Sequence, residues 1–303
     1  MIPQPKKYIS DFEQMGFGMF VHWGLYSQLG EGEWRYFYSD KTMEEYAKLA
    51  DTFTAEDFDA EKMVLLAKNA GCKYVVLTTR HHEGFSLYDT CGLHEFDSVH
   101  SAAKRDLVRE FVDACRKYDI VPFLYHTLID WSRPEYGSDF NAYLEYLRKS
   151  VEILCKNYGK IGGFWFDGSW NNASADWQED ELYGMIRKYQ PEAMIINNSG
   201  LSGRGRSDHP EIDAVTFEQK RPNPLNREGM DKYRAAEMCY TVNDHWGYGK
   251  NDFNYKSPME LIEALCNCRR LGANLLLNIG LEGNGRINPY QEQLFGILGR
   301  WMD

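Results

Sequence analysis

Two carboxylates in this 303-residue chain stand where a parallel strand is expected to end. Asp167 closes the apolar run Gly163 to Asp167 (GFWFD), and Glu218 closes the run Ile212 to Glu218 (IDAVTFE). A period of two places Trp165 and Asp167 on one face of the first run, with two phenylalanines on the other. A carboxylate at the edge of an apolar wall can act as nucleophile or base, and it can equally cap a helix or join a buried ion pair.

Two carboxylates that face each other across a barrel mouth suit glycoside hydrolysis. A separation of about 5–5.5 Å indicates retention through a covalent intermediate, and a wider gap indicates inversion. Glu33 and Glu237 are rival acids. Glu218 has a second interpretation, a rim salt bridge with Lys220 or Arg221.

Four histidines, His22, His81, His82 and His126, stand near predicted strand ends. They could hold a metal, but their spacing does not match the H-E-x-x-H pattern, and the first strand offers a lone histidine instead of a pair. Neutral imidazoles that bond to sugar hydroxyls fit the same positions. We therefore expect no metal and no cofactor.

Short apolar runs alternate with amphipathic helical runs along the chain. We expect strands over residues 17–23, 72–79, 120–126, 163–167, 193–197, 212–218, 237–242 and 273–279. We expect helices over residues 55–70, 104–118, 140–158, 180–189, 257–271 and 289–301.

This order predicts an α/β fold, an irregular (β/α)8 TIM-like barrel in which crossovers five and six lack regular helices. A doubly wound open sheet is the alternative. It is disfavoured because His22-Trp23-Gly24 follows the first strand where that fold carries a glycine fingerprint.

The barrel prediction gathers polar side chains at one rim, because active sites of this fold lie at the carboxyl ends of the strands. The polar or aromatic residues at those ends are His22, Arg80, His81, His82, Glu83, Tyr125, His126, Trp165, Asp167, Asn197, Asn198 and Glu218. Strand interiors are apolar, so polar residues distributed at random would not be concentrated at the strand ends in this way.

The composition disfavours some classes of binding partner. With 43% hydrophobic and 26% charged residues the chain is expected to fold, and a formal charge of −11 disfavours a nucleic-acid partner. No apolar run approaches the roughly 20 residues of a membrane span.

The chain is unusually rich in aromatic residues, with 8 Trp, 20 Tyr and 16 Phe. Rings beside His, Asn and carboxylates at one rim are typical of a small-molecule pocket and suit a sugar.

The amino-terminal stretch has no apolar segment and no small-residue cleavage site, so it does not read as a secretory signal. The seven cysteines are an odd number, and several lie inside apolar runs, where a reduced Cys acts as a small hydrophobe. We therefore expect a cytoplasmic protein.

Several stretches, in order along the chain, resemble the α-L-fucosidases of glycoside hydrolase family 29, and the likeness runs from about Phe17 to Trp301. The stretches that carry it are FGMFVHWGLYS from Phe17, GEW from Gly32, YVVLTTRHHEGF from Tyr74, RDLV from Arg105, WFDG from Trp165 and NLLLNIG from Asn274.

The resemblance implies a retaining exo-glycosidase that removes terminal L-fucose from an oligosaccharide or other small glycoside. Asp167 matches the nucleophile of the family. Glu218 is the best match to the acid/base and Glu237 the second. The positions that match the fucose-binding residues are His22, Glu33, Trp34, His81, His82 and Tyr125, and those that match aromatic residues beside the sugar are Trp165 and Trp246.

The chain departs from the family pattern in two ways. Many members carry Asn-Asp-Arg-Trp after strand five, whereas this chain reads Asn197-Asn198-Ser199-Gly200, so Arg204 or Arg206 would have to supply the basic contact. Many members also carry a β-sandwich after the barrel. We expect a single barrel domain over residues 1–303 without that sandwich, and a homo-oligomer in which a neighbour covers the mouth.

Two other functions stay open at this point. One is a fucose-binding barrel that has lost catalysis, which the missing basic residue favours. The other is a metal-dependent hydrolase that uses the four histidines.

Overall fold

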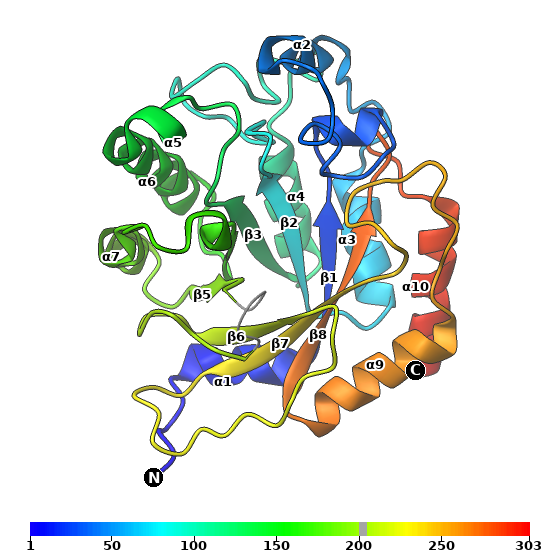
Figure 1. Ribbon diagram of the computed structural model, residues 1–303. Coiled ribbons are helices and arrows are strands. Elements are labelled where there is room, and N and C mark those ends of the chain that lie inside the picture. The colour runs from blue at the N-terminus through cyan, green and yellow to red at the C-terminus, as the bar shows by residue number, and fades with distance from the viewer. Residues whose placement is uncertain (200–204) are drawn as a thin grey trace.

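The computed structural model describes residues 1–199 and 205–303, and in it eight parallel strands close into one barrel in chain order (Figure 1). The strands are β1 (Phe17–His22), β2 (Tyr74–Arg80), β3 (Val121–Thr127), β4 (Gly163–Asp167), β5 (Met194–Asn197), β6 (Ala214–Glu218), β7 (Ala235–Thr241) and β8 (Ala273–Gly280). The predicted (β/α)8 barrel is confirmed, and each strand lies within two residues of its expected bounds.

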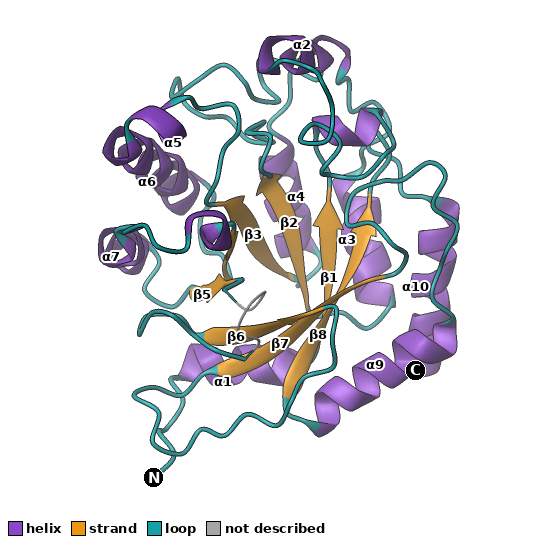
Figure 2. Cartoon of the chain, viewed as in Figure 1, coloured by secondary structure: helices purple, strands orange, loops and turns teal. Residues whose placement is uncertain are grey.

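Six longer helices surround the strands, as Figure 2 shows, and they correspond to the six expected ones. They are α3 (Ala60–Asn69), α4 (Leu107–Lys117), α6 (Phe140–Asn157), α7 (Glu179–Tyr189), α9 (Pro258–Arg270) and α10 (Pro289–Met302). Local chemistry sets their ends. The Ser257 side chain caps α9 by accepting the amide of Glu260, and Pro258 opens the helix.

The described parts of crossovers five and six are irregular, as predicted. Among the described residues between β5 and β6, and over residues 219–234 between β6 and β7, no helix is formed. The β5–β6 pairing is correspondingly short, with Ile196 opposite Ala214. The barrel is therefore joined most weakly between β5 and β6.

Helix α1 (Lys7–Met15) was not predicted from the sequence. It lies across the amino ends of the strands and contacts β5, β7 and β8 (Figure 1). Its Ile9 and Phe12 are fully buried among the side chains inside the barrel. It closes the floor of the barrel opposite the mouth, a role that its amphipathic pattern alone does not reveal.

Short helices also stand in the loops at or outside the mouth. They are η1 (Leu25–Gln28), α2 (Met43–Ala47), η2 (Lys48–Thr52), α5 (Glu135–Ser138) and η3 (Ser169–Asn172).

Strand alternation divides the apolar side chains into two cores. Trp165 lies inside the barrel with Phe20 and Tyr125, whereas Phe164 and Phe166 lie outside, between the strands and the helices. This is the division that a period of two predicts for β4. The aromatic side chains directly below the mouth therefore lie inside the barrel.

Strand β2 breaks this alternation near its end. The register with β3 pairs Thr78 with Tyr125 but Arg80 with His126, so one extra residue is inserted. Because of this irregularity Arg80 turns outward, where it donates to the Tyr146 hydroxyl at 2.6 Å. The prediction that places Arg80 at the rim is therefore wrong.

No helix within the described parts of the chain is both long and apolar enough to cross a bilayer. All seven cysteines are free, and five of them are buried.

Candidate active site

A pocket of about 210 Å³ lies at the carboxyl ends of the strands. It brings together the ten residues that the resemblance matches first to catalytic, fucose-binding or aromatic positions: His22, Glu33, Trp34, His81, His82, Tyr125, Trp165, Asp167, Glu218 and Trp246. Its volume is below the usual range for drug-sized ligands and suits one small molecule.

Asp167, at the end of β4, accepts hydrogen bonds at both carboxylate oxygens. Trp170 Nε1 donates to Oδ1 at 2.9 Å, and the Tyr125 hydroxyl donates to Oδ2 at 3.2 Å. The turn that returns Trp170 to the carboxylate needs Gly168, whose φ of +110° is strained for any residue with a side chain. The carboxylate is thus held in one orientation at the pocket wall.

Glu218, at the end of β6, faces Asp167 across an asparagine. The Asn198 amide nitrogen lies 2.6 Å from Glu218 Oε2 and 3.3 Å from Asp167 Oδ1. Since one nitrogen reaches both, these two oxygens are no more than about 6 Å apart, an upper limit that is compatible with the short separation of retaining glycosidases.

His22 is a neutral imidazole with a defined tautomer. Asn278 uses its amide to donate to the Trp246 carbonyl at 2.7 Å, so its Oδ1 accepts from His22 Nδ1 at 2.6 Å. Burial lowers the pKa of His22 to about 3. Nδ1 therefore carries the proton, and Nε2 is left as an acceptor for a substrate hydroxyl.

His82 is fixed in the same way. The Thr127 hydroxyl donates to the Ile129 carbonyl at 2.6 Å and accepts from His82 Nδ1 at 2.7 Å. Burial lowers the pKa of His82 to about 4, against the opposing effect of Asp167. His82 Nε2 lies 3.6 Å from Asp167 Oδ2. A hydroxyl group placed between them could donate to either.

Between these two imidazoles lies His81, whose pKa burial lowers well below its usual value, with His82 and His22 adding to the effect. Its ring is nearly parallel to that of Tyr125, with centroids 5.5 Å apart. The three histidines therefore form a neutral, hydrogen-bonding wall at neutral pH.

Glu33 enters the pocket from the loop after η1. Its Oε2 accepts the amide of Gly247 at 2.8 Å, and only 6% of the residue is exposed. Burial raises the pKa of Glu33, and the Gly247 amide opposes that rise.

Glu237, the second candidate for the acid/base, does not line the pocket. It is fully buried inside the barrel, where Trp165 Nε1 donates to it at 2.8 Å and the Tyr74 hydroxyl donates to its other oxygen. Burial raises the pKa of Glu237 to about 7. Its contacts hold the Trp165 ring in place at the pocket floor.

His126 also lies away from the pocket. Its Nε2 bonds to Ser150 at 2.8 Å on helix α6, outside the barrel. The prediction that places it at the rim is wrong because it alternates with Tyr125, which points inward. No group of three His, Cys, Asp or Glu side chains in the described residues is arranged to hold a metal ion.

Three lining residues were not predicted as site residues: Phe20, Trp170 and Asn198. Phe20 is two positions before His22 on the inward face of β1, so the period of two could have identified it. Asn198 was expected at the rim with the other strand-end residues and was noted as a departure from the family pattern, but it was given no role. Trp170 follows Asp167 by three residues, and its contact with that carboxylate depends on the turn at Gly168.

Two arginines were proposed to replace the missing basic residue, and the structure tests one of them. Arg206 is exposed and does not line the pocket, and Arg204 lies outside the described residues.

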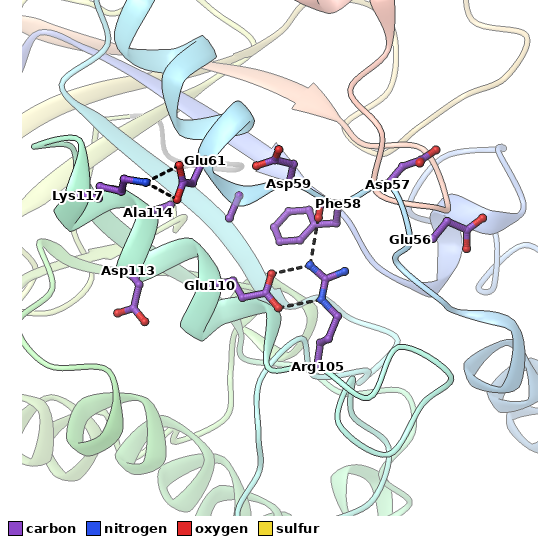
Figure 3. Close-up of a pocket in the computed structure, with 11 residues that line it drawn as sticks. Glu56, Asp57, Phe58, Asp59, Glu61, Arg105, Glu110, Asp113, Ala114 and Lys117 are labelled. Carbon is purple, nitrogen blue, oxygen red and sulfur yellow. Dashed lines mark hydrogen bonds and ion pairs between the residues drawn. The ribbon is translucent and has the colours of Figure 1, made fainter.

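A larger hollow, about 860 Å³, lies on the outer wall between α3 and α4 and has no connection to this chemistry (Figure 3). Figure 3 shows Arg105 paired with Glu110, and Lys117 paired with Glu61. The Arg105 guanidinium also donates to the Ala55 carbonyl at 2.6 Å. The Arg105 motif of the family resemblance is therefore explained by structure rather than by substrate binding.

Comparison with known proteins places this site in a family. The model of the α-L-fucosidase family matches residues 3–303. The chain belongs to the α-L-fucosidase family. Tissue α-L-fucosidase of Rattus norvegicus is 31% identical over 320 residues, which cover 96% of this chain and 67% of the rat protein.

Solved structures of this family have the same fold. Isoenzyme 1 from Paenibacillus thiaminolyticus has 34% identity and a TM-score of 0.88, over 98% of this chain and 75% of the other. AlfC from Lactobacillus casei, in complex with α-L-fucose, has 28% identity and a TM-score of 0.80, over 98% of both chains. A Bacteroides thetaiotaomicron member, trapped as a covalent intermediate with 2-fluoro-fucosyl fluoride, has 25% identity and a TM-score of 0.87, over 100% of this chain and 76% of the other.

Proposed function

We propose that this protein is a retaining, exo-acting α-L-fucosidase that hydrolyses terminal α-L-fucose from glycosides. The observation that carries the proposal is the short separation of Asp167 and Glu218, both within reach of one Asn198 nitrogen at the pocket wall. Such a pair supports double displacement through a glycosyl-enzyme.

In the first step Asp167 attacks the anomeric carbon. The bond to the leaving oxygen breaks, and Glu218, protonated, gives its proton to that oxygen. The hydrogen bonds from Trp170 and Tyr125 keep the Asp167 carboxylate aimed without reorganisation during the step.

In the second step Glu218 acts as a base. It takes a proton from a water molecule whose oxygen attacks the anomeric carbon, and the bond to Asp167 breaks. Two inversions give net retention, and both side chains return to their starting protonation states.

Two walls of the pocket recognise different parts of the sugar, one through hydrogen bonds and the other through apolar contact. The neutral imidazoles of His22, His81 and His82 offer hydrogen bonds to hydroxyl groups, and Glu33 adds a carboxyl group. Phe20, Trp165 and Trp246 supply an apolar surface that suits the C6 methyl group of fucose.

A fucose-binding barrel without catalysis is the less favoured function. Both carboxylates are present, and each is held by donors suited to an ionised or reacting group. A histidine-dependent metallohydrolase is disfavoured because His126 lies outside the barrel and the other three imidazoles have structural or aromatic neighbours.

The direct test is hydrolysis of an aryl α-L-fucoside, with the anomer of the first product followed by NMR. We expect turnover with α-L-fucose released first. Asp167→Gly should lose at least about 10⁴-fold in kcat, and added azide should restore formation of the inverted β-fucosyl azide. Full activity of Asp167→Gly would refute the nucleophile, and tight fucose binding without turnover would select the binding barrel.

Two further expectations stay predictions: a cytoplasmic location, and a homo-oligomer in which a neighbour covers the mouth.

A further inference from the structure

Asn198 is buried at the end of β5, with 2% exposed surface, between the two carboxylates of the pocket. Its backbone amide donates to the Phe166 carbonyl at 2.8 Å, which continues the β4–β5 pairing by one residue. The side chain therefore starts from a fixed backbone position directly beside Asp167.

The orientation of the Asn198 amide is determined by its three partners. The ionised Asp167 carboxylate only accepts hydrogen bonds, so the amino group must face it, and the same amino group lies 2.6 Å from Glu218 Oε2. The Thr216 hydroxyl donates to Asn198 Oδ1 at 2.9 Å and satisfies the opposite end. A flipped amide would set its oxygen against the ionised Asp167 carboxylate and is excluded.

We propose that Asn198 is a positioning residue that couples the nucleophile to the acid/base: one amino group, oriented by Thr216, holds Asp167 and Glu218 at the separation that double displacement requires. The inference rests on the proposed function and extends it. One of the two groups is ionised in each step, Asp167 before the attack and Glu218 after it has given up its proton, and one neutral amino group can donate to both without adding a charge.

The chain offers a matched control in the neighbouring asparagine. Asn197 is equally buried, but its amide points to the other face of β5, where it donates to the Tyr183 hydroxyl at 3.0 Å and to Glu179 at 3.2 Å. Asn197→Ala and Asn198→Ala therefore remove the same group from adjacent positions, and only the second touches the carboxylates.

The experiment compares kcat, KM and the pH profile of both variants on an aryl α-L-fucoside, with thermal unfolding as a check on folding. We expect Asn198→Ala to lower kcat by about 10- to 100-fold, the range for loss of a hydrogen bond to a charged group, with KM changed far less. Because a lost donor disfavours both carboxylate forms, both limbs of its kcat/KM profile should move to higher pH. Asn197→Ala should lose stability but keep the parental kcat and pH profile.

Two additional variants should reduce kcat by amounts that differ from the loss in Asn198→Ala. Asn198→Asp replaces the donor by a third carboxylate and should reduce kcat at least as much as Asn198→Ala. Thr216→Val removes the hydroxyl that orients the amide and should give a smaller loss in the same direction.

A parental kcat and pH profile in Asn198→Ala, or an equal loss of kcat in Asn197→Ala, would overturn the inference. No turnover by the unmodified protein would instead overturn the proposed function and the inference together. Turnover that is lost in Asp167→Gly but intact in Asn198→Ala would overturn the inference alone.

Discussion

Glu218 on β6 and Glu237 on β7 are two inward-facing carboxylates on neighbouring strands, and they occupy different depths of one barrel. The register pairs Glu218 with Cys239 and Thr216 with Glu237. Glu237 therefore lies two residues, about 7 Å, below the level of Glu218. Glu218 lines the pocket, whereas Glu237 is enclosed by Tyr74 and Trp165.

This difference shows that the depth of a carboxylate in the barrel, rather than its order in the chain, decides whether it takes part in catalysis or supports a neighbouring side chain. A carboxylate at the mouth can reach substrate and exchange protons with solvent. A carboxylate one layer down can only orient the ring above it, and burial raises its pKa because the charged form loses its hydration.

Glu218→Ala is expected to have the largest effect within this pair. Loss of a general acid should lower kcat/KM by about 10²- to 10⁴-fold on a fucosyl disaccharide, whose leaving oxygen needs a proton. The loss should be much smaller on a nitrophenyl fucoside, whose leaving group departs as an anion. Equal losses on both substrates would show that Glu218 is not the acid.

Glu237→Ala should instead act on stability. It leaves the Trp165 Nε1 and the Tyr74 hydroxyl without acceptors in a buried site and removes packed atoms, at a cost of about 2–4 kcal/mol in the free energy of unfolding. Denaturant unfolding measures this directly. Glu237→Gln, which keeps one acceptor and adds one donor, is the control and should fold and retain most activity. Loss of activity in Glu237→Gln comparable to that of Glu218→Ala would reverse the roles given to the two residues.

Trp170→Phe should cause an intermediate loss of activity, because the substitution changes a contact at the mouth of the barrel only. It keeps the aromatic ring but removes the 2.9 Å hydrogen bond to Asp167 Oδ1, so kcat should decrease by about tenfold. Steady-state kinetics at the pH optimum test this, with Trp177→Phe as a control, since Trp177 Nε1 donates to the Asn172 carbonyl and does not reach the pocket. Parental kcat in Trp170→Phe would show that the other donors are sufficient.

The smallest expected effect is on the pH dependence of stability. The pKa of Glu237 is raised from 4.5 to about 7, so the folded state holds a proton that the unfolded state releases between these values. The contribution of Glu237 to stability is therefore fully present below pH 4.5 and is lost as the pH rises through 7. Burial also raises the pKa of Glu83, to about 8, with the same sign. Glu237→Gln should reduce this decline, measured by denaturant unfolding from pH 4.5 to 8, without abolishing it. An unchanged slope would contradict the assignment.

Strand alternation and the positions of strand ends were enough to predict much of the site. Asp167 and Glu218 each end a short apolar run, and the ends of parallel strands in a barrel meet at one rim. The same rule failed at His126, which lies on the outward face, and at Arg80, which the extra residue in β2 turns outward. The rule locates a strand end but does not fix which way its side chain points.

The sequence by itself determined the barrel, the candidate carboxylates and the family, because period, strand order and motif order are properties of the chain. Only the tertiary structure decided between Glu218 and Glu237, since the choice depends on the register between β6 and β7. It also decided the carboxylate separation, which rests on Asn198, a residue on a third strand. Helix α1 likewise acquires its role only through contacts with strands far along the chain, because side-chain packing is set by the assembled barrel. The contact of Trp170 with Asp167 is local, but it depends on the turn geometry at Gly168.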